Sequence, residues 1–290
     1  NMKIIKEKIY DCFPFFNELD LLEVRLNYLD SVVDYFVLCE SITTHSGLPK
    51  KLFYSENKSL FKEFEHKIIH VVVEDTPKEW IKAKPFLTDQ YQRSAIMRGL
   101  TGANDNDIII TSDVDEIPNI DVIKDLDNFF QPDTLYHLAQ DMFYYYLNLK
   151  EVSGKLLSHT GEFPDIEDKK WLGTKICDYA FLKKYNVDKL RHPDMKENAK
   201  RISNGGWHFT YVGSHKKTTA GERVQLKIGS LCHQEFNNSY YKLNVNKNIE
   251  NNKDVFFRDS KFEIVELDST FPEYIVANRG RFKHLIKGMP

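Results

Sequence analysis

The sequence predicts an α/β protein built on a doubly wound, mostly parallel central sheet. Two observations lead to this fold class. In the first third of the 290 residues, short continuous apolar runs, typical of buried parallel strands, alternate with amphipathic stretches of helical length. The fourth apolar run, residues 107–111, then passes directly into a cluster of acidic residues. Alternation of this kind is typical of repeated strand–helix units in an open sheet.

The elements of this first part follow from local patterning. An apolar strand lies within residues 4–16, and a helix follows in which leucines recur every three or four positions, at Leu19, Leu22, Leu26 and Leu29, with charges on the other face. The later elements are predicted as two strands, an amphipathic helix and a fourth strand, at residues 34–41, 67–75, 88–100 and 107–118.

The pattern changes near residue 131, where we place a soft boundary. Residues 135–149 form a long aromatic stretch that predicts a strand, and an amphipathic helix is predicted to end near residue 237. Close to the C-terminus, Ile275, Phe282 and Leu285 share one apolar face. This half lacks the strand–helix alternation of a nucleotide-binding fold and suits a region that binds a second substrate.

Composition excludes several classes of protein. Forty basic residues oppose 43 acidic ones, so no surplus charge favours nucleic acid or an anionic membrane. No apolar run approaches the ~20 residues of a membrane span, and the first residues lack the apolar segment of a signal peptide. These features predict a cytoplasmic location without a transmembrane segment. The four widely spaced cysteines include no CxxC pair, which predicts buried free thiols rather than a structural zinc or a disulfide framework.

The most informative segment is Ser112–Pro118, which contains Asp113 and Asp115 at the end of a strand of β-branched residues. Ligands of open α/β sheets bind at the carboxyl ends of the strands. In an ideal strand these two side chains would point to opposite faces, but a turn before Pro118 lets both reach one cation or its water shell. Carboxylate oxygens suit Mg²⁺ or Mn²⁺, and such a cation can also hold a nucleotide diphosphate.

Three interpretations of this acidic segment compete. A solvated acidic turn after a strand is the simplest. A haloacid-dehalogenase-type phosphatase uses a DxDx(T/V) pattern, but Ile117 stands at its last position, the segment lies far from the first strand, and no later acidic pair supplies a second metal ligand. A metal-dependent glycosyltransferase uses paired aspartates and a cation to neutralise the leaving diphosphate of a sugar nucleotide.

Four segments resemble glycosyltransferase family 17, the family of bisecting N-acetylglucosaminyltransferases: residues 17–41, 112–118, 205–211 and 271–285, read as NELDLLEVRLNYLDSVVDYFVLCES, SDVDEIP, GGWHFTY and FPEYIVANRGRFKHL. The resemblance runs from about Ile9 to Leu285. It implies a GT-A type, Rossmann-like fold, UDP-GlcNAc as donor, Mn²⁺ or Mg²⁺ as cofactor, a glycan hydroxyl as acceptor, and inversion at the anomeric carbon. It divides the chain into a nucleotide-sugar-binding half, residues 2–130, and an acceptor-binding half of the same catalytic domain, residues 131–290.

The resemblance also implies roles for individual residues. His208 is expected to join Asp113 and Asp115 as a metal ligand, and Gly205 and Gly206 to let backbone approach the diphosphate. Further donor-site residues, each with a structural role as its simpler interpretation, are Glu40 and Ser41 at the nucleoside and Arg93 at a phosphate or a nearby acid.

An inverting transfer needs a base that deprotonates the acceptor hydroxyl, and the candidates are Glu235, Asp178 and Asp141, with Glu235 preferred. Aromatic residues of the second half could stack on sugar faces. The sequence therefore predicts an inverting, metal-dependent glycosyltransferase. The alternatives are the aspartate-nucleophile phosphatase and a sugar-binding module without catalysis.

Overall fold

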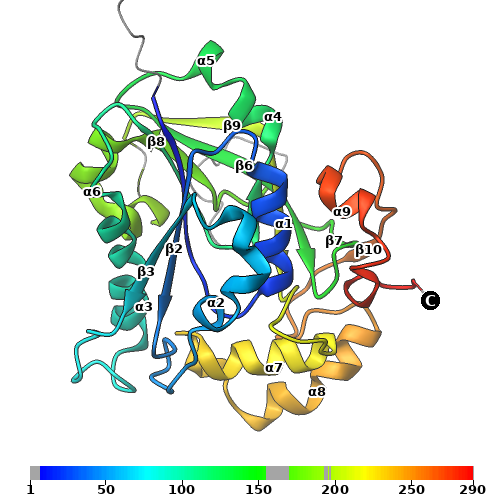
Figure 1. Cartoon of the computed structure of the whole chain (residues 1–290). Helices are drawn as coiled ribbons and strands as arrows, with labels where there is room; N and C mark the ends of the chain where they lie inside the picture. The colour runs from blue at the N-terminus through cyan, green and yellow to red at the C-terminus, as the bar shows by residue number, and fades with distance from the viewer. Residues whose placement is uncertain (1–6, 155–169, 193–194, 196, 290) are drawn as a thin grey trace, which may run out of the picture.

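A ten-stranded sheet forms the centre of the described chain (Figure 1). The computed structural model describes residues 7–154, 170–192, 195 and 197–289. Four strands in the order β3-β2-β1-β4 pair in parallel: β1 (Ile9–Pro14), β2 (Tyr35–Ser41), β3 (Ile68–Val73) and β4 (Ile108–Thr111). The predicted α/β class is thus confirmed, and each of the four predicted strands of the first part is present.

Beyond β4 the sheet becomes mixed rather than parallel. Antiparallel pairing links β4 to β8, β8 to β6, β6 to β7 and β7 to β10, whereas β9 runs parallel to β6 and antiparallel to β5. The strands of this part are β5 (Glu116–Pro118), β6 (Leu135–Tyr144), β7 (Leu149–Glu151), β8 (Lys175–Asp178), β9 (Ala199–Thr210) and β10 (Phe262–Ile264). The predicted aromatic strand therefore divides into β6 and β7, and both halves of the chain contribute to one sheet.

Helices cover both faces of the parallel strands because alternate strand residues point to opposite sides. On one face, Phe13 of β1 packs in a core with the leucines of α1 (Leu19–Leu29) and with α4 (Ile120–Lys124) and α5 (Leu126–Phe129). On the other face, the neighbouring Cys12 packs with α6 (Tyr179–Arg191) and a 3₁₀ segment, Ala95–Leu100. The helix predicted over residues 88–100 is therefore α3 (Pro85–Ser94) followed by this 3₁₀ segment.

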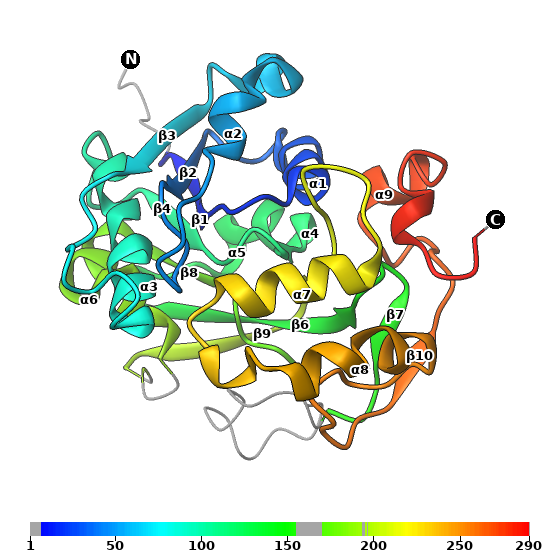
Figure 2. The ribbon, with the colours of Figure 1, turned by 90° about the horizontal axis from the view of Figure 1, so that it is seen from below.

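The second half covers the carboxyl end of the parallel strands. Helix α7 (Ala220–Ser230) begins at a capping box formed by Thr219 and Glu222. It packs with α8 (Ser239–Glu250) on residues at the end of β6 and just after it, Met142, Tyr144 and Tyr145 (Figure 2). The predicted helix ends at Ser230, earlier than expected. Near the C-terminus, the predicted apolar face is fully buried against α1, although only α9 (Glu273–Ala277) is an α-helix there.

The remaining described segments are short. After β2, α2 (Phe53–Glu56) and a 3₁₀ segment, Lys58–Phe64, lead to β3. Two further 3₁₀ turns lie at Gln234–Phe236 and Lys283–Leu285. In the part of the chain that the structure describes, no helix combines the length and the apolar character that crossing a bilayer requires.

Candidate active site

A cavity of about 530 Å³ opens at the carboxyl ends of the parallel strands. Its walls include the ends of β1 and β2, the turn after β4, one face of α3, and residues of β9 and α7. The chain order reverses between β1 and β4, because β2 and β3 lie on one side of β1 and β4 on the other. Such a switch point is where open α/β sheets bind ligands, and the volume suits a small organic molecule.

Arg25 of α1, whose side chain is completely buried, holds the acidic turn after β4 in place. Its guanidinium forms a bidentate ion pair with Asp11 of β1, at 2.6 and 2.7 Å. The same group donates to the backbone oxygens of Asp113 and Glu116, both at 2.9 Å. Five fixed donors on one planar group thus set the path of the turn. The sequence pattern placed the charges of α1 on its outer face, and Arg25 corrects that prediction.

Asp113 faces the cavity and is bound by two arginines. Its Oδ1 lies 2.5 Å from Arg93 of α3, and its Oδ2 lies 3.0 Å from Arg191 at the end of α6. Burial disfavours the charged carboxylate, but Arg191 and Arg93 hold the pKa of Asp113 well below its usual range. Asp113 is therefore ionised at neutral pH, and both of its oxygens are engaged.

Asp115 meets a different pair of groups. Its Oδ2 lies 3.2 Å from the Lys227 ammonium of α7, and its Oδ1 lies 3.6 Å from Nε2 of His208. Burial raises the pKa of this carboxyl, but Lys227 and His208 outweigh burial and bring it to about 2. Lys227 also lies 3.1 Å from Glu18, at the start of α1, so one buried ammonium joins two carboxylates.

A third acid, Glu116, completes the cluster. It is fully buried, accepts from the indole nitrogen of Trp171 at 2.7 Å and from the backbone of Asp113 at 2.8 Å, and pairs with Arg191 at 3.1 Å. The Trp171 ring in turn lies against His208, with 4.9 Å between ring centroids. Trp171 thus supports the position of His208, and it also lines the cavity.

His208 reaches the site because β9 pairs with β5, which places it beside Glu116 in register. Gly206 makes this pairing possible: its φ is +129°, and a Cβ there would lie 2.1 Å from the oxygen of Ile117. At Gly205 a Cβ would lie 2.6 Å from the backbone nitrogen of Ala139. The two glycines therefore allow close packing within the sheet, and their predicted role at a diphosphate is not needed to explain them.

Two of the three predicted metal ligands lie close together in the structure. Asp115 and His208 bring an oxygen and a nitrogen together, while Asp113 stands apart with its oxygens on arginines. The charges nonetheless suit a cation, because three cationic groups (Arg93, Arg191 and Lys227) pair with five carboxylates (Glu18, Asp89, Asp113, Asp115 and Glu116). A divalent ion that takes few protein ligands and fills its shell with water and phosphate oxygens fits this arrangement.

Glu40 and Ser41 line the cavity, but their side chains serve the fold. The Glu40 carboxylate accepts from the backbone nitrogens of Tyr54 and Ser55, which begin α2, at 3.2 and 3.0 Å, and lies 2.9 Å from His70. Ser41 donates to the carbonyl of Val73 at 3.2 Å. The simpler, structural interpretation thus accounts for both residues: Glu40 accepts from the first turn of α2 and Ser41 holds β3, so no nucleoside is needed to explain their positions.

None of the three predicted bases lines the cavity. Asp178 ends β8, which runs antiparallel to β4, so it lies beside Ile108 at the opposite edge of the sheet and caps α6. Asp141 does not line the cavity and binds Lys150 and Lys170. The predicted roles of both residues as bases are therefore corrected: the direction of β8 places Asp178 away from the cavity, and ion pairs with two lysines account for Asp141. Glu235 does not line the cavity either: it is 55% exposed and lies 2.7 Å from His233, which does line it.

No sequence pattern indicates that three of the site's cationic residues, Arg25, Arg191 and Lys227, contact the acidic turn. Each lies in a helix whose charged residues look like an ordinary solvated face, and each is separated from Asp113 by more than 75 positions. Glu116 did carry a signal, since it continues the acidic run of the turn.

Comparison with known proteins assigns the chain to a family. The model of glycosyltransferase family 17 matches residues 1–289, so the chain belongs to this family of glycosyltransferases. Among named relatives, the β-1,4-mannosyl-glycoprotein 4-β-N-acetylglucosaminyltransferases of Rattus norvegicus and Homo sapiens are each 28% identical over 148 residues. Each match covers 48% of this chain and 27% of the relative, so the shared part is about a quarter of the relative's length.

Two solved structures that resemble the chain do so with low TM-scores. The apo structure of the bifunctional glycosyltransferase WbbM gives a TM-score of 0.36 at 8% identity, over 70% of this chain and 39% of that one. A UDP-glucose pyrophosphorylase complexed with UDP-glucose gives 0.34 at 8% identity, over 69% and 92% of the two chains. Because both TM-scores are low, we describe the fold from the strand order of this chain and not from these two structures.

Proposed function

We propose that the chain transfers GlcNAc from UDP-GlcNAc to a sugar hydroxyl of a glycan, with inversion and with a divalent cation, Mn²⁺ or Mg²⁺. The observation that carries this proposal is the position of Asp113 and Asp115 at the switch point of the parallel strands, facing the cavity. Family membership and the names of the relatives support the donor and the reaction.

In this proposal Asp115 and His208 would hold the cation, and the nearby Asp113 would add negative charge to the site. The bound cation would neutralise charge that develops on the leaving diphosphate. Arg93 and Arg191 keep Asp113 ionised and fixed, and Arg25 sets the backbone beneath it. Because these groups are already in place, little reorganisation is required when the donor binds.

In this proposal one of two carboxylates accepts the proton of the acceptor hydroxyl. Asp188 of α6 lines the cavity and lies 3.4 Å from His192. Glu235, the base preferred from the sequence, does not line the cavity but pairs with His233, which does. The Asp188 and Glu235 side chains are 22% and 55% exposed, so both are more accessible than the buried Asp178.

Asp115→Asn tests the metal and donor assignment. The wild-type chain should gain thermal stability when UDP and Mn²⁺ are added together, more than with either alone. Asp115→Asn should lose that gain and should lower transfer from UDP-GlcNAc by roughly 10²–10³-fold, the usual effect of removing one group that stabilises developing charge. The matched control is Asp141→Asn, a partly exposed carboxylate outside the cavity.

Three outcomes would contradict the proposal. Transfer at wild-type rate by a folded Asp115→Asn protein would remove the metal-site assignment. Hydrolysis of small phosphoesters with Mg²⁺, without transfer, would favour the phosphatase. Binding of free glycans without any response to nucleotide would favour the sugar-binding module. A panel of UDP-sugars then identifies the donor.

A further inference from the structure

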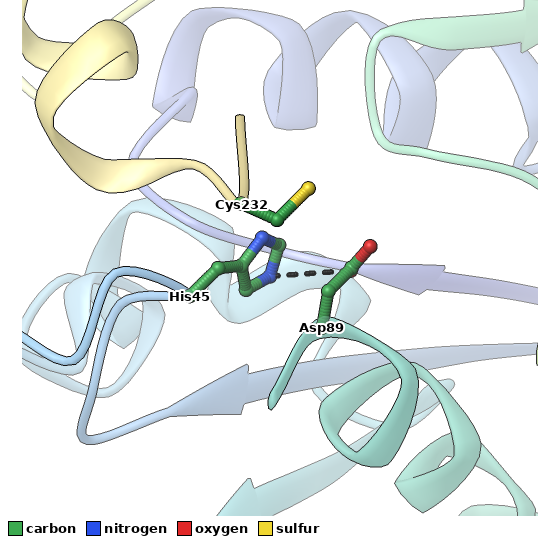
Figure 3. A group of neighbouring side chains, drawn as sticks. All are labelled: His45, Asp89 and Cys232. Carbon is green, nitrogen blue, oxygen red and sulfur yellow. Dashed lines mark ion pairs between the residues drawn. The ribbon is translucent and has the colours of Figure 1, made fainter. Parts of the chain in front are cut away.

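A second group of potential metal ligands lies at the wall of the same cavity. His45 comes from the loop after β2, Asp89 from α3, and Cys232 from the segment after α7 (Figure 3). One ligand atom of each lies within 4.8 Å of those of the other two. Across residues 7–154, 170–192, 195 and 197–289, no other histidine, cysteine or acidic residues form such a group of three.

The three ligand types are those that zinc takes in proteins. Imidazole nitrogen, carboxylate oxygen and thiolate sulfur bind Zn²⁺ at about 2.0–2.3 Å, which places tetrahedral ligands roughly 3.3–3.8 Å apart. The 3.4 Å between Nε2 of His45 and Oδ1 of Asp89 already lies in this range, and the widest separation, at most 4.8 Å, exceeds it by no more than about 1 Å. Changes of side-chain rotamer can supply that contraction, because all three residues are only half-buried and border the cavity.

The hydrogen-bonding capacity of the His45 ring is only partly satisfied by the described residues. Its Nε2 lies 3.4 Å from Oδ1 of Asp89, the contact drawn in Figure 3. Its Nδ1 is buried and finds no hydrogen-bond partner among the described residues. A buried nitrogen left without a partner is costly, and ligation is one way in which that cost is removed.

Arg93 is the group that opposes a cation here. It lies 3.3 Å from Oδ1 of Asp89, but its shorter contact is with Asp113 at 2.5 Å. A carboxylate has two oxygens and can serve an arginine and a metal together. Coordination would also deprotonate the Cys232 thiol, with release of the proton to solvent, so the thiolate and the Asp89 carboxylate together balance a divalent ion.

We propose that His45, Asp89 and Cys232 form a binding site for a divalent cation of the Zn²⁺ type, separate from Asp115 and His208. Three protein ligands leave a fourth position for water or for a group in the cavity. The ion would join three segments that are far apart in sequence and that all border the cavity. This site does not depend on the identity of the sugar donor, and it goes beyond the proposed transfer reaction.

Cobalt substitution tests the site directly. The full chain is freed of metal with a chelator, kept reduced, and titrated with Co²⁺, whose thiolate complexes absorb in the near ultraviolet. One equivalent should produce that band in the wild-type protein, and Zn²⁺ should displace it. His45→Ala and Cys232→Ser should lose the band, and each should weaken Zn²⁺ binding by at least about tenfold, the lower end of what changes around metal sites cause.

Two variants serve as controls. His233→Ala removes the histidine next to Cys232, which is 56% exposed and paired with Glu235, and should keep the band. Asp115→Asn should also keep it, because Asp115 belongs to the other site. The proposal is overturned if the wild-type protein shows no band while a thiol assay finds Cys232 reduced, or if the band survives in Cys232→Ser. These outcomes do not depend on transfer activity, so the two proposals fail separately.

Discussion

Lys227 offers the sharpest test of how the acidic turn is held. Its ammonium lies 3.1 Å from Glu18 and 3.2 Å from Asp115, and the three side chains are only 13%, 5% and 8% exposed. Burial by itself would lower the pKa of Lys227, but Asp115 and Glu18 raise it above its ordinary value. The ammonium is therefore charged at neutral pH. Lys227→Met keeps the length of the side chain and removes the charge.

The expected cost follows from burial. Removing one partner of a buried ion pair leaves an uncompensated charge and typically costs about 3–5 kcal/mol of the free energy of unfolding. Two carboxylates lose their partner here, although His208 still faces Asp115. The matched control is Lys51→Met, which breaks the exposed pair with Glu56, where the side chains are 71% and 50% exposed. That change should cost less than about 1 kcal/mol.

Urea unfolding at pH 7 measures both effects. We expect Lys227→Met to lower the midpoint strongly with little change in slope, and Lys51→Met to leave it near the wild-type value. A double-mutant cycle with Asp115→Asn should show coupling of at least about 1 kcal/mol, because neutralising Asp115 removes part of the unpaired charge. A loss for Lys227→Met no larger than that for Lys51→Met, or an additive cycle, would refute the ion-pair argument.

Two further predictions test structural assignments. Asp178→Ala should lower the free energy of unfolding by about 1–2 kcal/mol, because α6 loses its N-terminal cap. The rate of transfer should stay within twofold of wild type. A large loss of transfer in a folded Asp178→Ala protein would instead indicate that Asp178 is the base. Gly206→Ala should lower the free energy of unfolding by at least about 2 kcal/mol, because φ is positive there and a Cβ would meet the oxygen of Ile117. Gly229→Ala in α7 should leave stability unchanged or raise it, because there is open space around Gly229. Thermal unfolding compares the two variants, and equal effects would contradict the packing argument.

The local elements could be predicted because periodicity records burial along a single segment. The four parallel strands, α1 and the acidic turn all follow from runs of residues that are contiguous in sequence. The errors have a common origin. The sequence predicts Asp178 at the cavity because nothing local reveals that β8 runs antiparallel to β4. It predicts Arg25 on the outer face because a buried arginine looks the same in sequence as an exposed one.

The sequence by itself therefore determined the fold class, the family and the place of Asp113 and Asp115 at the carboxyl edge of the sheet. Only the tertiary structure decided which cations meet those carboxylates, since Arg191 and Lys227 arrive from helices of the second half. The same holds for Cys232: the spacing of the cysteines indicated no zinc site, yet the fold brings its thiol to a histidine and an aspartate. The physical reason is that ion pairing and ligation depend on distance in space, which strand order and direction set and which local patterning does not record.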